Sequence, residues 1–156
     1  MEAVEIKDFM IRDVVHVKKD ETLRSLLKKL VEHKIGGVPV VDHQQRLLGM
    51  VSDGDVLRAL TPRDQTVFDF YTISFVMEKQ EVDTSIRRQL DDTVEQIMTR
   101  RSLSYVHPDD DFRQVLKILS RHRFKKIPVI NGAERVIGVI SRGDVLRYIS
   151  RQMLEE

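Results

Sequence analysis

The chain has 156 residues and no cysteine, and its 26 lysines and arginines nearly balance its 25 aspartates and glutamates. Without cysteine there is no disulfide framework and no thiolate chemistry, and a near-neutral chain has no global field that would draw it onto nucleic acid or an anionic membrane. No apolar run approaches the ~20 residues of a membrane span, and the first residues lack a signal-peptide pattern. We therefore expect a soluble, cytoplasmic protein of one domain or two small ones.

The first 60 residues predict the order strand, helix, strand, strand, helix. Apolar side chains between Leu23 and Val31 fall at i, i+3, i+4, i+7 and i+8, the stripe of an amphipathic helix, which the glycines at 36 and 37 end. Two short apolar runs around a polar turn predict a hairpin, and Ser52 can cap a closing helix. The predicted ranges are 13–17 for the first strand, 23–31 for the helix, 38–41 and 47–51 for the hairpin, and 52–60 for the closing helix.

The same pattern occurs a second time. Identical residues recur 89 positions later for Pro39, Gly49, Ser52, Asp55 and Arg58. Between the stretches Val38–Arg58 and Ile127–Arg147, 10 of 21 positions are identical, which indicates an internal repeat. Met98 follows Met10 by only 88 residues, so the second copy has one extra residue before its first long helix.

Residues 61–93 separate the two copies. They are too many for a simple connector and too apolar for a disordered linker, so we expect helices that pack on the repeats or on a partner subunit. The predicted organisation is a first repeat at 1–60, a helical insertion at 61–93 and a second repeat at 94–156.

Each copy resembles the cystathionine-β-synthase (CBS) domain family. The resemblance rests on the strands Gly-Val-Pro-Val-Val and Lys-Ile-Pro-Val-Ile and on two Gly-x-x-Ser-x-x-Asp segments, which end at Asp55 and Asp144. It covers nearly all of residues 4–150 except the insertion and identifies a tandem CBS pair, or Bateman module. It implies an α/β (α+β) fold of two pseudo-symmetric repeats, each with a three-stranded sheet, with the sheets packed together and two clefts between them.

The resemblance also implies a regulatory module and not an enzyme. Clefts of this family take adenosine-containing ligands such as AMP, ADP, ATP or S-adenosylmethionine, as in energy sensing, and binding changes the angle between repeats or subunits. Two modules often pair. We therefore expect an adenine nucleotide as ligand, a homodimer, an effector protein that the sequence does not identify, and no catalytic cofactor.

The aspartate of each Ser-x-x-Asp segment is the predicted ribose site. In the family it accepts hydrogen bonds from the ribose hydroxyls, and the matching residues are Asp55 and Asp144. Ser52 and Ser141 begin helices, where a hydroxyl can contact phosphate or cap the helix. Because capping alone explains a serine followed three residues later by an aspartate, both interpretations stay open.

Each family cleft takes its aspartate from one repeat and much of its wall from the other, which predicts two different sites. We expect Asp55 to face Lys125 and Lys126, a cationic wall. We expect Asp144 to face the pair Gly36–Gly37, which exposes backbone N–H groups but supplies no charge.

Three arginines and a wall of small and apolar residues complete the predicted clefts. Arg58 and Arg147 occupy matching helix positions, where a guanidinium can hold phosphate or face solvent, and Arg142 adds a charge where the first copy has Asp53. The expected adenine wall consists of Val14, Val15, His16, Gly36, Gly37, Val38, Ser102, Leu103, Ser104 and Ile127.

Other functions fit less of the sequence. The five histidines lack the spacing of metal ligands, and we find no phosphate loop or nucleophile motif. The basic stretch 121–126 could bind nucleic acid with Phe124 as a stacking platform, but we expect a helix end and a cleft wall there. Two alternatives stay open: a dimerisation or protein-interaction module without a small ligand, and a receptor for cyclic di-AMP.

Overall fold

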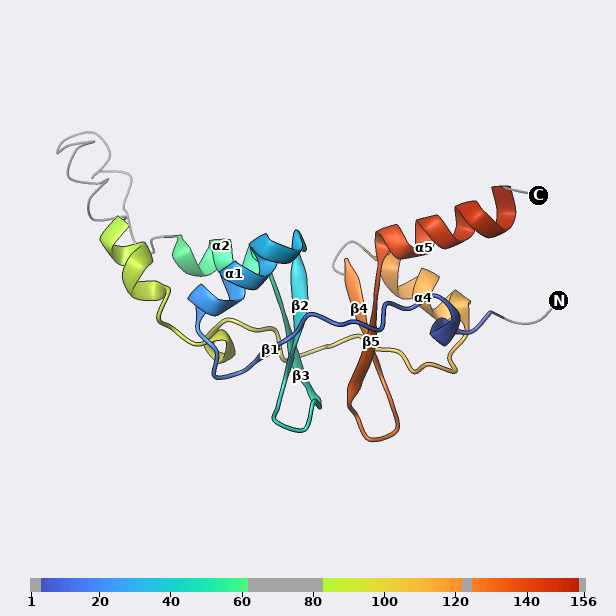
Figure 1. Cartoon of the computed structure of the whole chain (residues 1–156), viewed down its shortest axis with the longest axis horizontal. Coiled ribbons are helices and arrows are strands. Elements are labelled where there is room, and N and C mark those ends of the chain that lie inside the picture. Colours follow the sequence, from blue (N-terminus) through green and yellow to red (C-terminus); the bar gives the residue numbers. More distant parts are fainter. Residues whose placement is uncertain (1–3, 62–82, 122–124, 155–156) are drawn as a thin grey trace.

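The computed structural model describes residues 4–61, 83–121 and 125–154. Two small sheets lie side by side at the centre, each flanked by its own helices (Figure 1). The first half contains β1 (Val17–Lys18), α1 (Leu23–His33), β2 (Gly37–Val41), β3 (Leu47–Ser52) and α2 (Asp53–Leu60). The second contains α4 (Phe112–Leu119), β4 (Lys126–Ile130), β5 (Val136–Ser141) and α5 (Arg142–Ile149), which continues into η3 (Ser150–Leu154). The predicted α/β fold of two similar repeats is confirmed.

The first strand of each repeat is short. β1 pairs in parallel with β2, and the other edge of β2 pairs antiparallel with β3. β1 begins only at Val17, the last residue of the predicted strand. In the second repeat the matching position is one parallel bridge between Val106 and Val129, beside the antiparallel hairpin of β4 and β5. The second sheet therefore has two strands and a bridge where the first has three strands.

The pairing of these strands locates the extra residue of the second copy. Val17 and Val106 hold matching places beside β2 and β4 and lie 89 residues apart. Thr99 matches Ile11 at a separation of 88, because each pairs with the second hairpin strand of the other half. The extra residue falls between Thr99 and Val106, where Ser102 takes a left-handed conformation with φ of 56°.

The helix α1 confirms its predicted amphipathic stripe, but it is ended by Lys34 and not by the glycines 36 and 37. Its buried residues are Leu23, Leu26 and Leu30. Lys34 follows the helix with φ of 53°, and its N–H donates to the carbonyls of Leu30 and Val31. The left-handed residue that ends the helix is thus a lysine, while Gly37 already begins β2.

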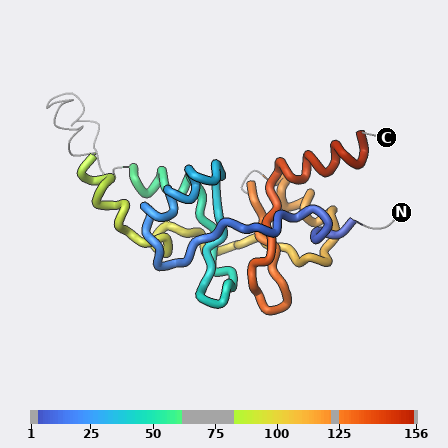
Figure 2. Tube along the Cα trace, viewed as in Figure 1, coloured from blue at the N-terminus to red at the C-terminus, as the bar shows by residue number. Residues whose placement is uncertain are grey.

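The residues that lead into each repeat pack on the other repeat. The short helix η1 (Ile6–Asp8) places Ile6 in the core of the second half, and η2 (Val94–Gln96) places Val94 in the core of the first. Figures 1 and 2 show the N-terminal segment lying against the second half before it crosses to β1. Neither core is complete without the lead-in of the other repeat, so the two repeats are interlocked.

Backbone pairing fixes this exchange. The N–H of Ile11 donates to the carbonyl of Val139 and the N–H of Val139 donates to that of Ile11, both at 2.9 Å. Thr99 and Met50 bond in the same reciprocal way, at 2.8 and 3.0 Å. Each lead-in therefore adds a bridge to the outer hairpin strand of the opposite half.

Of the insertion, the structure describes residues 61 and 83–93. Residues 83–89 are helical, and Leu90 packs against the first core. Most of the apolar run expected to pack on the repeats lies in 62–82, outside the described residues, so the boundaries at 61 and 93 stay predictions. No helix in the described part of the chain is long and apolar enough to cross a membrane.

Candidate functional site

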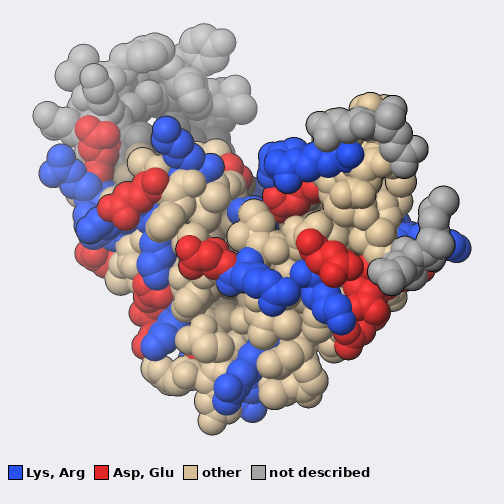
Figure 3. All heavy atoms as spheres, turned by 45° about the vertical axis from the view of Figure 1, so that its right-hand side comes forward, with Lys and Arg blue, Asp and Glu red and all other residues tan. Residues whose placement is uncertain are grey.

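The predicted site residues gather at one end of the two sheets. Gly37 at the start of β2 pairs with Ser52 at the end of β3, and Lys126 pairs with Ser141 in the same way in the second half. Both pairs lie at the end of the sheets where α2 and α5 begin (Figure 1). In the space-filling view this end is hollowed between two lobes, with acidic and basic side chains on its walls (Figure 3).

A capping box orients the aspartate of each repeat. The Ser52 hydroxyl accepts from Asp55 N at 3.3 Å, while Asp55 Oδ2 accepts from Ser52 N at 2.9 Å and from the Ser52 hydroxyl at 3.1 Å. In the second repeat the distances between Ser141 and Asp144 are 3.2, 2.8 and 2.8 Å. The capping interpretation of both Ser-x-x-Asp segments is confirmed, and it fixes each carboxylate at a helix start.

The second oxygen of each carboxylate is held by an arginine one turn further along. Arg58 Nη2 lies 2.7 Å from Asp55 Oδ1, and Arg147 Nη2 lies 2.6 Å from Asp144 Oδ1. The arginine side chains are 74% and 63% exposed, whereas those of the aspartates are 15% and 8% exposed. The predicted phosphate arginines therefore fold back onto the predicted ribose carboxylates, with their heads open to solvent.

The sequence prediction missed the glycines beneath these arginines. A β-carbon on Gly54 would lie 3.3 Å from Arg58 Nη1, and one on Gly143 would lie 3.3 Å from Arg147 Nη1. Both glycines recur at the offset of the repeat, so the sequence contained the signal. It did not show that an arginine four residues later lies across them.

Lys126 reaches a different partner from the one predicted. Its ammonium donates to the carbonyl of Gly37 at 3.1 Å. The side chain is half-buried, and burial lowers the pKa of Lys126 while the Asp144 carboxylate raises it. Its charge therefore lies near Gly37 and Asp144, so the prediction of an uncharged wall on that side is wrong. Lys125 is exposed, and its carbonyl accepts from Arg142 N.

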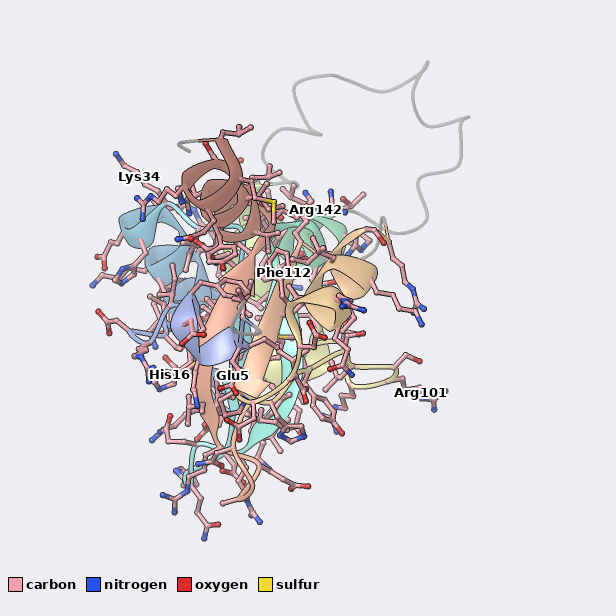
Figure 4. The ribbon with its side chains drawn as sticks, turned by 90° about the vertical axis from the view of Figure 1, so that its right-hand side faces the viewer. Glu5, His16, Lys34, Arg101, Phe112 and Arg142 are labelled. Atoms are coloured by element: carbon pink, nitrogen blue, oxygen red, sulfur yellow. The ribbon has the colours of Figure 1, made fainter. Side chains whose placement is uncertain are left out.

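The side chain of Arg142 turns away from its predicted role. Its Nη2 donates to the carbonyl of Arg121, just after α4, at 3.1 Å, and its Nε is buried without a hydrogen-bond partner among the described residues. Arg142 also lines a groove between α4 and α5. Figure 4 marks it at the end of the sheets where α5 begins. Its hydrogen bonds stabilise the α4 side of the repeat and do not support a phosphate contact beside Asp144.

Two residues of the predicted adenine wall belong to the cores. Val38 and Ile127 are fully buried in the first and second cores, so their side chains cannot line a cleft; sheet strands covered on both faces bury successive residues. His16 is partly buried, and its Nδ1 lies 3.1 Å from the Val14 carbonyl. Figure 4 places His16 below Arg142, alongside the sheets. The partly exposed members of the wall are Val14, Val15, His16, Gly37, Leu103 and Ser104, and the exposed ones are Gly36 and Ser102.

No group of three or more potential metal ligands occurs within residues 4–61, 83–121 and 125–154. The polar chemistry at the strand ends is that of three carboxylates, two arginines and one lysine, together with two capped helix starts. The third carboxylate is that of Asp53, which lies beside Gly36. Such a set suits an organic ligand with hydroxyl and anionic groups better than a bare cation.

Comparison with known proteins agrees with this architecture. The family model for the CBS domain matches residues 6–62 and 94–151. The chain is 23% identical over 153 residues to uncharacterized protein MJ1426 of Methanocaldococcus jannaschii, covering 92% of this chain and 90% of that protein. It is 30% identical over 148 residues to CBS domain-containing protein CBSX2, chloroplastic, of Arabidopsis thaliana, covering 91% of this chain but only 62% of that protein.

A solved structure of CBSX2 gives the same result in three dimensions. The crystal structure of CBSX2 in complex with AMP matches with a TM-score of 0.71 and 27% identity, covering 94% of this chain and 96% of that one. The matched family regions span both halves of the fold described above and exclude most of the insertion. The chain therefore belongs to the CBS domain family and carries two CBS repeats in tandem.

Proposed function

We propose that this chain is a regulatory module that binds an adenine nucleotide (AMP, ADP or ATP) or S-adenosylmethionine and catalyses no reaction. The observation that carries the proposal is the duplicated carboxylate: Asp55 and Asp144 are held in the same capped geometry at the hollowed end of the molecule. The likeness to CBSX2, whose crystal structure is a complex with AMP, supports this ligand class.

The hydrogen bonds of each aspartate suggest how a nucleotide would be received. Oδ2 is fixed by the capping box, while Oδ1 is paired with an exposed arginine. A ribose hydroxyl that takes the place of the arginine at Oδ1 leaves the guanidinium free for the phosphate of the same ligand. The carboxylate would then bind ribose, and Arg58 or Arg147 would bind phosphate.

Such an exchange would also transmit a signal. Each arginine lies on the helix that begins at the site, so moving it changes the surface of α2 or α5. A ligand can shift the arrangement of the repeats only as far as it binds one arrangement better than another. We propose that an effector protein reads this difference, as in energy sensing.

We also propose that the chain forms a homodimer through the outer faces of its helices. Leu57 on α2 and Leu146 on α5 occupy matching positions and are 67% and 66% exposed. Leu146 also lines the largely apolar groove between α4 and α5, and Met153 and Leu154 beyond it are exposed. Exposed apolar side chains favour association, and these residues would equally serve an interaction module without a small ligand.

A thermal-shift screen tests the nucleotide proposal. Purified protein, shown to be free of carried-over nucleotide, is melted with AMP, ADP, ATP, S-adenosylmethionine, NAD, cyclic di-AMP and, as a base control, GTP. A ligand at about 100 times its dissociation constant adds roughly 2.7 kcal/mol to the folded state. We expect stabilisation by adenine nucleotides and not by GTP. Stabilisation by cyclic di-AMP alone would identify that receptor class, and no stabilisation by any compound would favour the interaction module.

A further inference from the structure

The two repeats differ at a position where they touch. Lys126 and Gly37 hold the same place in their repeats, 89 residues apart, and the Lys126 ammonium donates to the Gly37 carbonyl at 3.1 Å. Residues related by the internal repeat thus meet at the junction of the halves, and only one of the two carries a charge. The ammonium thus reaches from the second half, where it interacts with Asp144, to Gly37, which pairs with the Ser52 that caps Asp55.

The fold leaves little room for a second side chain at this contact. A β-carbon on Gly37 would lie 3.2 Å from the carbonyl oxygen of Val51 and 3.6 Å from the Cα of Ser52. Those neighbours are backbone atoms of β3 and cannot easily give way. A lysine at position 37 would also bring a second positive charge towards Lys126, and like charges repel. Of the two matching positions, which pair with Ser52 and Ser141, only Lys126 carries a side chain, so the junction is asymmetric in charge.

Lys126 is held by a contact that an anion can displace. Its hydrogen-bond acceptor is a neutral carbonyl, and the nearby Asp144 carboxylate is already bonded to Ser141 and Arg147. A lysine ammonium sits on a flexible four-carbon stem, and hydrogen bonds to anionic acceptors are stronger than those to neutral ones. A phosphate on either side of the junction would therefore draw the ammonium away from Gly37.

We propose that Lys126 is a phosphate-binding residue shared by the two nucleotide sites, so that a phosphorylated ligand at one site opposes binding at the other. This inference rests on the proposed function of Asp55 and Asp144. When the ammonium moves to a phosphate beside Asp55, the Asp144 site loses that positive charge. Each ligand then lowers the affinity for the other by the same factor, because the two binding equilibria are linked. A nucleoside without phosphate does not compete for Lys126, so the opposition is confined to phosphorylated ligands.

Calorimetric titration of the full chain with AMP and with adenosine tests the proposal. For each ligand, the ratio of the affinities of the two sites is measured. In the wild type this ratio should be at least about fivefold larger for AMP than for adenosine, because about fivefold is the lower end of typical coupling between sites. Lys126→Met keeps the apolar stem and removes the charge, so the separation for AMP should shrink to that for adenosine. Lys126→Arg should retain the wild-type separation, and so should Lys117→Met, the control at an exposed lysine of α4 outside the predicted clefts.

The outcomes distinguish a failure of the shared Lys126 from a failure of the proposed nucleotide binding. If Lys126→Met keeps the wild-type separation of AMP affinities, or if one AMP binds per chain in both proteins, Lys126 is not shared and the inference is wrong while nucleotide binding stands. If none of adenosine, AMP, ADP, ATP and S-adenosylmethionine binds the wild type, the proposed function is wrong, and so is the inference that rests on it.

Discussion

The sulfur of Met10 lies directly over Gly138, so close that a β-carbon added to the glycine would be 2.5 Å from it. Met10 belongs to the lead-in of the first repeat and Gly138 to the outer hairpin strand of the second. The matching contact of the other half places the carbonyl oxygen of Thr99 2.7 Å from a β-carbon on Gly49. Gly49 and Gly138 are therefore required because the lead-in of the other repeat packs directly against them, and not because either lies in a turn.

Gly138→Ala and Gly49→Ala should each lower the free energy of unfolding by about 1–3 kcal/mol, the usual cost of overpacking. The loss should be larger for Gly49, because it meets a backbone oxygen, whereas Met10 is a flexible side chain that can shift. Denaturant unfolding followed by circular dichroism measures both. Gly132→Ala is the control, since nothing lies within 4 Å of its added β-carbon. Equal stability of all three variants would contradict the exchanged packing.

The capping boxes predict a second effect on stability. Ser52→Ala and Ser141→Ala remove the hydroxyl that accepts from the N3 amide of α2 or α5, and loss of such a cap typically costs about 1 kcal/mol. Thermal melts of the two variants should show similar losses, because the two boxes have similar geometry. A variant as stable as the wild type would mean that its hydroxyl does not cap the helix in solution.

Lys126 gives a pH dependence whose sign is fixed by its environment. Burial lowers its pKa from the ordinary 10.5, and Asp144 only partly offsets this. Between the lowered pKa and 10.5 the unfolded chain binds more protons at this residue than the folded chain. The contribution of Lys126 to the free energy of unfolding should therefore rise with pH across that window. Denaturant unfolding in that window should show that the free energy of unfolding of the wild type, measured relative to Lys126→Met, increases with pH.

The same titration should weaken phosphate binding. AMP carries a fully ionised phosphate above about pH 7, so its charge stays constant while Lys126 loses its proton. We expect AMP affinity to fall as pH rises through the lowered pKa of Lys126, at lower pH than an exposed lysine would produce, with little change for adenosine. A pH profile of AMP affinity that is the same in wild type and Lys126→Met would exclude Lys126 as the titrating group.

Self-association is testable through the two matching leucines. Replacing Leu57 or Leu146 with lysine places a charge on the exposed helix faces without entering either core. Light scattering after size exclusion should show a dimer for the wild type and a shift towards monomer for the variants, with unchanged melting temperature in dilute solution. Arg113→Ala, at an exposed position of α4, is a surface control. A monomeric wild type would contradict the proposed dimer.

The repeat and its local elements could be predicted from sequence because each depends on short-range patterns. The hairpin strands, the stripe of Leu23, Leu26 and Leu30, and the capped Ser-x-x-Asp segments are determined by spacing within about ten residues, and the structure confirms them. Family resemblance added the pairing of two repeats, which the fold also shows.

What could not be predicted depends on contacts between distant segments. The apolar side chain of Ile6 predicts burial, but the sequence pattern does not indicate that Ile6 packs in the core of the other repeat. Lys126 has a long stem, so its position in the sequence did not fix which carboxylate its ammonium approaches. Val38 was expected at the cleft because of its place in the motif, yet its side chain is fully buried in the first core.

The measurement that tests the central claim most directly is calorimetric titration of AMP into the wild type, Asp55→Asn, Asp144→Asn and the double variant. An asparagine oxygen can still accept the capping bonds, so the helix starts are kept while the charge is lost. Each single variant should lose about tenfold or more in affinity at one site, since a hydrogen bond to a charged group contributes roughly 1.5–3 kcal/mol, and the double variant should show no binding in the same range. A folded double variant that binds AMP as tightly as the wild type would contradict the account.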